Sequence, residues 1–127
     1  MNKIATILFA ALLVPSVSFA SGDDAAKIRL VKKIYQEASR DDEPGVKILN
    51  RYADDSLKKA IRTASRSADL CIEADPIWNS QDPETEVKVN VSALSNGKIR
   101  AGFKQWGHPT KVDYSVSCSG NVCKVTD

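Results

Sequence analysis

Residues 87–116 read VKVNVSALSNGKIRAGFKQWGHPTKVDYSV, and this stretch decides the fold. Valine, isoleucine, alanine and aromatic residues occupy every second position in three successive runs, with mostly charged or small polar residues between them. Alternation with a period of two is typical of a strand that has one buried and one exposed face. The three runs therefore predict an antiparallel meander with one apolar side.

The connection at residues 95–97 sets the register of the first two runs. A two-residue turn would place Ala93 opposite Arg100, an apolar residue against a charged one. A three-residue connection with Gly97 in the left-handed conformation instead pairs Ala93 with Ile99. We expect the three-residue connection, because a slip of one residue would turn every apolar side chain of the strand toward water.

Upstream of the strands the apolar period is that of helices. Apolar residues recur every three or four positions in three segments, at about 23–39, 46–53 and 54–75. Pro44 and Gly45 separate the first two helices, and Asp54, Asp55 or Ser56 caps the third. The predicted fold class is α+β, in which three N-terminal helices pack on a curved, four-stranded antiparallel meander. Residues 122–126 form its short last strand.

The first twenty residues have the pattern of a secretory signal peptide. Lys3 precedes an apolar run at 4–14, and Ser18 and Ala20 provide the small residues of a cleavage site. We expect cleavage between Ala20 and Ser21, a single domain at 21–127, and a periplasmic or secreted location. The run is shorter than the ~20 residues of a membrane span, so no transmembrane anchor is expected.

A secreted location favours disulfides, and the chain has three cysteines. Gly120 and Asn121 suit a type II′ hairpin turn, in which Cys118 and Cys123 face each other across the strands at a Cα separation of ~4.5 Å. A disulfide between these two is expected. Cys71 is then a small buried hydrophobe, the partner of one of the other two, or a reactive thiol.

Recognised catalytic and cofactor motifs are missing from the sequence, which has no phosphate loop, nucleophile elbow, metalloprotease or EF-hand pattern. His108, the only histidine, cannot form an imidazole zinc site alone, and catalysis by it would need Cys71, Asp75 or Asp82 nearby. No cofactor or metal is therefore expected. With 18 basic and 16 acidic residues, the charge also gives no reason to expect nucleic acid as a partner.

Two regions are candidates for binding. The segment 75–83 carries the candidates Trp78, Gln81 and Asp82, and its polar groups Asp75, Gln81 and Asp82 could converge at the mouth of the cone formed by sheet and helices. Alternatively, aspartates satisfy turn amides there while Trp78 plugs the end of the core. The polar face of the sheet offers Arg100, Lys104 and Trp106, accompanied by further lysines at 88, 98 and 111. Tryptophan and arginine are enriched among binding hot spots, so this face is either an interface or a solvated surface.

Three short segments resemble a secreted bacterial domain-of-unknown-function family of the nuclear transport factor 2-like superfamily. They are VKKIYQ at 31–36, LKKAI at 57–61, and DPI at 75–77 followed by Gln81 and Asp82. The resemblance implies a cystatin-like cone in which helices fill the hollow of a curved sheet. It implies no activity, because isomerases and dehydratases of the superfamily are similar only in architecture.

The sequence thus favours a non-catalytic periplasmic or secreted binding module, such as an inhibitor or immunity-type protein. Its expected partner is a protein of the cell envelope, and a homodimer through the sheet face is a further possibility. The alternatives are a small-molecule enzyme with Asp75 or Asp82 as base, and an accessory protein of the envelope or of a secretion system.

Overall fold

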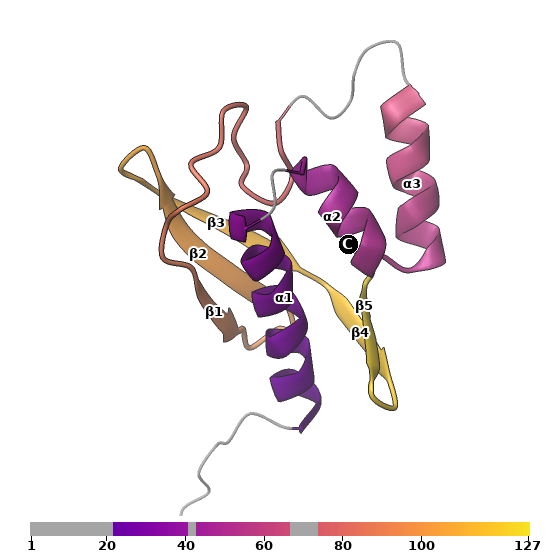
Figure 1. The fold of residues 1–127 in the computed structure, drawn as a ribbon. Coiled ribbons are helices and arrows are strands. Elements are labelled where there is room, and N and C mark those ends of the chain that lie inside the picture. Colours follow the sequence, from indigo (N-terminus) through magenta and orange to yellow (C-terminus); the bar gives the residue numbers. More distant parts are fainter. Residues whose placement is uncertain (1–21, 41–42, 67–73) are drawn as a thin grey trace, which may run out of the picture.

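Three helices precede the strands along the chain, as the change of apolar period predicts. The computed structural model describes residues 22–40, 43–66 and 74–127. The helices and strands of this part of the chain are α1 (Gly22–Arg40), α2 (Gly45–Tyr52), α3 (Asp55–Arg66), β1 (Asn90–Ala93), β2 (Ile99–Gln105), β3 (His108–Tyr114), β4 (Val116–Ser119) and β5 (Val122–Val125) (Figure 1). The α+β class is confirmed. The predicted signal peptide, its cleavage point between Ala20 and Ser21, and Cys71 lie outside the described residues.

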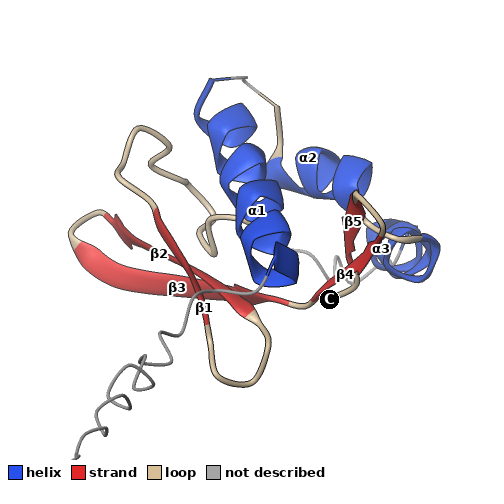
Figure 2. Cartoon of the chain, turned by 90° about the horizontal axis from the view of Figure 1, so that it is seen from below, coloured by secondary structure: helices blue, strands red, loops and turns tan. Residues whose placement is uncertain are grey.

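α1 and α2 use the faces that their apolar spacing indicates, whereas the expectation that α3 also packs on the sheet is corrected, because α3 has no buried residue and Ala60 of its apolar stripe is exposed. α1 buries Val31, Ile34, Tyr35 and Ala38 against the strands, and Figure 2 shows α1 and α2 on the same side of the strands. Of the three candidate caps for α3, Asp54 is the one observed, since its Oδ1 accepts the N–H of Leu57 at 2.8 Å. Of the expected continuation of this helix beyond Arg66, residues 67–73 lie outside the described residues, and Ala74 and Asp75 are not helical.

The first sheet has the predicted register. Its order is β1-β2-β3, fully antiparallel, and Ala93 pairs with Ile99. The three-residue connection is present, with Gly97 at a φ of 87° and the N–H of Leu94 bonded to the carbonyl of Lys98. The third strand begins at His108, earlier than the alternation indicates, so only Trp106 and Gly107 remain in the second turn.

The expectation of one four-stranded meander is corrected, because β4 and β5 form a separate two-stranded sheet. The predicted strand through 112–116 divides at Ser115, one residue after the last β2–β3 pair, Ile99 with Tyr114. Ser115 bonds instead to the end of the chain: its N–H donates to the carbonyl of Asp127, and its carbonyl accepts the N–H of Thr126. Ser115 thus faces two residues, Thr126 and Asp127. This is the arrangement of a β-bulge, which bends a strand.

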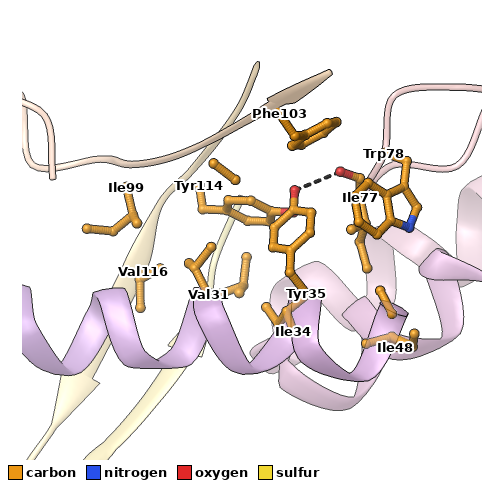
Figure 3. Packing of buried hydrophobic residues seen from close by; sticks show 13 residues of the cluster. Val31, Ile34, Tyr35, Ile48, Ile77, Trp78, Ile99, Phe103, Tyr114 and Val116 are labelled. Carbon is orange, nitrogen blue, oxygen red and sulfur yellow. Dashed lines mark hydrogen bonds between the residues drawn. The ribbon is translucent and has the colours of Figure 1, made fainter. Parts of the chain in front are cut away.

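Aromatic rings form the centre of the core (Figure 3). The ring of Tyr35 meets that of Trp78 edge-on at a centroid distance of 5.0 Å and lies 5.6 Å from Phe103 and 6.2 Å from Tyr114. Trp78 also meets Phe103 edge-on at 5.1 Å. Edge-to-face pairs at these distances stabilise by about 0.5–1.5 kcal/mol beyond the burial of apolar area. Trp78 therefore belongs to the buried core, as one interpretation of its sequence context expects.

A hydrogen-bonded chain crosses this cluster. The hydroxyl of Tyr35 donates to the carbonyl of Ile77 at 2.7 Å and lies 2.8 Å from the hydroxyl of Tyr114. A phenol has one proton, so Tyr114 must be the donor in the second bond. The two bonds join α1, the 74–80 loop and β3 inside a core where water is excluded.

Replacing Tyr35 by phenylalanine is expected to lower the free energy of unfolding by about 1–3 kcal/mol, because the carbonyl of Ile77 and the hydroxyl of Tyr114 both lose their partner. Tyr114→Phe is the matched control, since it removes a donor but leaves the bond to Ile77, and its cost should be smaller. Urea unfolding of both variants measures the difference. Equal losses in the two variants would contradict this order of donors.

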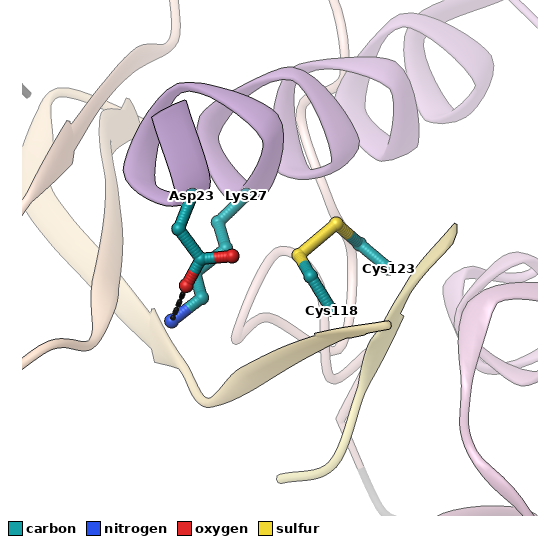
Figure 4. The surroundings of a disulfide bond; sticks show 4 residues. All are labelled: Asp23, Lys27, Cys118 and Cys123. Atoms are coloured by element: carbon teal, nitrogen blue, oxygen red, sulfur yellow. Dashed lines mark ion pairs between the residues drawn. A yellow bond between two sulfur atoms is a disulfide. The ribbon is translucent and has the colours of Figure 1, made fainter. Parts of the chain in front are cut away.

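The β4–β5 hairpin has the predicted pairing, in which Cys118 faces Cys123 and Val116 faces Val125. The cysteines form a disulfide with a Cα–Cα distance of 4.0 Å. Gly120 has a φ of 62°, as the first central residue of a type II′ turn requires. Figure 4 shows the bridge beside α1, near the ion pair of Asp23 and Lys27.

Reduction of this disulfide is expected to cost about 2 kcal/mol, a small effect because the bridge closes a short loop. Urea unfolding with and without reductant measures it, with a Cys71→Ser background to prevent exchange. Mass spectrometry of a nonreduced digest of the unaltered chain should show Cys118 joined to Cys123. A bridged peptide that contains Cys71 would contradict the pairing.

Candidate functional site

The turn between β2 and β3 carries the most exposed aromatic side chain of the described residues. Trp106 is 57% exposed, although its indole is held in place. The indole Nε1–H donates to the carbonyl of Asp82 at 2.8 Å, and the backbone N–H of Trp106 lies 3.2 Å from Oε1 of Glu84. These bonds attach the 82–84 loop to the turn and fix the direction of the indole.

The neighbouring Gln105 fastens the same loop from the core side. Its Oε1 accepts the N–H of Glu84 at 2.8 Å, while its Nε2 donates to the carbonyl of Glu84 at 2.7 Å. The side-chain amide thus forms two hydrogen bonds with the backbone of Glu84, as a residue of a neighbouring strand would. Gln105 is buried, and the two bonds meet the hydrogen-bonding need of its amide. The loop beneath Trp106 is consequently fixed on both sides.

The backbone at Trp106 is unusual for so large a residue. Trp106 has a φ of 52° and Gly107 a φ of 84°, so both central residues of this two-residue turn are left-handed. Such turns favour asparagine, aspartate or glycine at the first position. For other residues the left-handed conformation costs about 1–2 kcal/mol. The tryptophan at the tip of the hairpin therefore destabilises the turn by about this amount.

The outer face of the first sheet, opposite the helices, is basic. Arg100 and Asp113 are cross-strand neighbours and form a two-pronged ion pair at 2.8 and 2.9 Å. The hydrogen bonds from Arg100 hold the pKa of Asp113 below its usual value, and Lys111 and Lys98 lower it further by their charge. Lys104 is also exposed on this face, next but one to Trp106. The carboxylate of Asp113 thus lies near three cations, Arg100, Lys111 and Lys98.

The structure separates the sequence-predicted binding residues into two groups. Arg100, Lys104 and Trp106 follow one another along β2 and its turn, and the backbone of Asp82 is bonded to Trp106. Trp78, in contrast, is 1% exposed and belongs to the core. Gln81 is exposed in the loop that precedes the turn.

The carboxylate of Asp75 accepts hydrogen bonds from backbone N–H groups, which is the structural role that the sequence offers as an alternative to a catalytic base. Its Oδ2 accepts the N–H of Gly45 at 2.8 Å, and its Oδ1 accepts those of Ile77 and Trp78 at 2.9 and 3.4 Å. A side chain at position 45 would collide with this carboxylate, so only glycine fits there. Both oxygens of Asp75 are thus used in joining α2 to the 74–80 loop.

Two residues of this site, Glu84 and Gln105, are not recognised from the sequence. Gln105 does leave a signal, because it continues the buried positions 99, 101 and 103 of β2 and is the one polar residue of that series. A polar side chain at a core-facing position needs a partner. Which partner it finds depends on the path of the 82–84 loop, which no local pattern specifies.

The described residues offer no cluster of side chains for a metal ion. None of their histidine, cysteine, aspartate and glutamate side chains gather in threes at a spacing suited to a metal ion. His108 is exposed at the start of β3. Burial raises the pKa of Tyr35 and of Tyr114 far above neutrality, so both phenols keep their protons.

Comparison with models of protein families, with curated proteins and with solved structures finds no match to this chain. The class that the structure itself defines is an α+β protein with an antiparallel three-stranded sheet, a disulfide-bonded hairpin and a basic outer face bearing an exposed tryptophan. Among the described helices, none has the length and apolar character needed to cross a membrane.

The three tyrosines are expected to resist ionisation in the folded protein. Burial, and then the hydrogen bond to Glu37, raises the pKa of Tyr52 to about 12, and burial raises the pKa of Tyr35 and of Tyr114. In the unfolded chain the pKa is about 10. Because the folded pKa values are the higher ones, their contribution to stability is complete below pH ~10 and is lost as the pH rises further.

Absorbance of tyrosinate near 295 nm, recorded between pH ~9 and ~11, measures this directly. The folded protein should show almost none, whereas the protein in urea should ionise with a midpoint near 10. A full tyrosinate signal near pH 10 from the folded protein would contradict the burial of these phenols.

Proposed function

We propose that this chain is a non-catalytic binding module outside the cytoplasm, and that it holds a protein partner against the outer face of its first sheet. The observation that carries the proposal is Trp106, exposed and yet fixed by two hydrogen bonds in a strained turn. Strained backbone persists where the surrounding structure enforces it, and it is concentrated at binding and catalytic sites. Tryptophan is also one of the residues that are enriched among the hot spots of interfaces.

The lysines along the outer face bear on the chemistry of the partner, whereas the charged side chain bonded to Trp106 itself is the acid Glu84. Lys104, Lys98 and Lys111 are exposed on the outer face, whose aspartate already pairs with Arg100. The partner should therefore present carboxylates toward these lysines, beside an apolar pocket that receives the indole. Charges at the rim of an interface mainly accelerate association and select the partner, whereas the buried aromatic provides affinity.

The disulfide between Cys118 and Cys123 is consistent with an oxidising compartment, periplasmic or extracellular. An inhibitor or immunity-type protein for an envelope enzyme or toxin suits these properties. We also propose that the chain is a member of the secreted bacterial family of the nuclear transport factor 2-like superfamily. A homodimer has less support, because two copies of one basic face repel each other. An enzyme with Asp75 as base also has less support, because backbone N–H groups occupy both of its oxygens.

Trp106→Asn is expected to abolish partner capture without unfolding the protein. Asparagine suits the left-handed turn, so relief of about 1–2 kcal/mol of strain offsets the loss of a hydrogen bond worth about 1 kcal/mol. The measurement is quantitative mass spectrometry of proteins retained from envelope extract by immobilised residues 21–127. A specific partner should fall at least about 10-fold with the variant.

Val122→Asn is the matched control, since Val122 is 60% exposed at the tip of the other hairpin. This change should leave capture unaltered. Equal capture by Trp106→Asn and the unaltered chain would overturn the proposal. A loss of stability well above about 2 kcal/mol in Trp106→Asn would show that the indole serves chiefly to hold the 82–84 loop.

A further inference from the structure

A groove runs between the C-terminal half of α1 and the chain that leads into β1. It encloses about 530 Å³ and is lined by α1 residues Lys32, Tyr35, Gln36, Ser39 and Arg40 and by Val87, Val89 and Val91. It lies on the helix-covered side of the sheet, so it is separate from the outer face that bears Trp106. Figure 1 shows α1 alongside β1 at this end of the sheet.

The two walls of the groove differ in chemistry. The three valines are half-buried and form an apolar wall. The α1 wall is polar, and Lys32 contributes an exposed positive charge to it. Glu37 of the same helix bonds to Tyr52 and Arg51 of α2. The groove therefore suits a ligand that combines apolar groups with a negative charge.

The backbone beside the groove is open for pairing. β1 is an edge strand, and in the described part of the chain β2 is its sole partner. Leu94 donates to Lys98, so the alternation of an antiparallel ladder directs Ser92 and Asn90 toward β2. Val91 and Ala93 consequently point their N–H and C=O groups outward. β1 contains neither a charge nor a proline, two common devices that protect an exposed edge.

We propose that this groove binds an extended acidic peptide segment of another protein, which pairs with β1 as an additional strand. The outward groups of Val91 and Ala93 provide main-chain hydrogen bonds, and these give affinity in strand addition. Alternate side chains of the peptide then enter the groove. Apolar ones cover the valines, and a carboxylate between them reaches Lys32 of the α1 wall.

Strands in globular proteins usually have about three to ten residues, so a peptide within this range is long enough to pair with β1. This site goes beyond the partner surface at Trp106 and does not depend on it. The groove and the surface at Trp106 lie on opposite sides of the same sheet, so occupation of one leaves the other accessible.

The test uses four fluorescein-labelled peptides of the form TXTETXT, where X is valine, leucine, isoleucine or phenylalanine. Their X and glutamate side chains share one face of a strand. Fluorescence anisotropy with residues 21–127 should detect binding of at least one peptide below 1 mM. The same peptide with lysine in place of glutamate should bind at least 10-fold more weakly.

Lys32→Glu should reverse this preference, so that the lysine peptide binds more tightly than the glutamate peptide. Lys33→Glu is the matched control: Lys33 is the next residue of α1 but contacts the ring of Tyr52 rather than the groove, and the change should preserve the preference. Amide hydrogen exchange should show at least 10-fold added protection at Val91 and Ala93 in the complex. Trp106→Asn should leave peptide binding unaltered, which separates this site from the outer face.

Failure of all four peptides to bind at 1 mM would overturn the proposal. So would binding that Lys32→Glu does not change, because the charge of the groove would then have no part in it. Binding without added protection at Val91 and Ala93 would also overturn it, since the peptide would not be a strand of this sheet.

Discussion

The fold depends on one buried hydroxyl. Tyr35 donates its phenolic proton to the carbonyl of Ile77 and accepts that of Tyr114, so a single side chain joins segments 42 and 79 residues away in sequence. Its ring meanwhile contacts Trp78 and Phe103. Polar groups in such a core are costly unless every partner is present, so this arrangement admits few alternative packings. It determines where the 74–80 loop must lie.

The candidate binding surface follows from that placement. With Ile77 held by Tyr35, Asp75 bonds to the first turn of α2, and the chain then passes beside the end of β2. There Gln105 and Trp106 fasten the 82–84 loop. Trp106 is therefore supported by contacts that lead back to the core, and this support allows a tryptophan to occupy a left-handed turn and remain exposed.

Residues whose structure depends on near neighbours could be predicted. The spacing of Val31, Ile34 and Tyr35 indicates a helix face, the turn at 95–97 sets the register of the first hairpin, and Gly120 with Asn121 places Cys118 opposite Cys123. The break at Ser115 could not be predicted, because the alternation of apolar residues continues through it. Its cause is a pairing with Thr126 and Asp127, which depends on where the end of the chain lies.

The sequence by itself determined the α+β class, the buried faces of α1 and α2, the registers of the first and last hairpins and the disulfide, because these follow from side-chain period and turn chemistry over a few residues. Only the tertiary structure decided that Trp78 is buried while Trp106 is exposed, that Asp75 is a structural bridge, and that Gln105 grips a loop. Those outcomes depend on contacts between distant segments. Local pattern cannot specify them, because each requires a partner that the fold alone brings near.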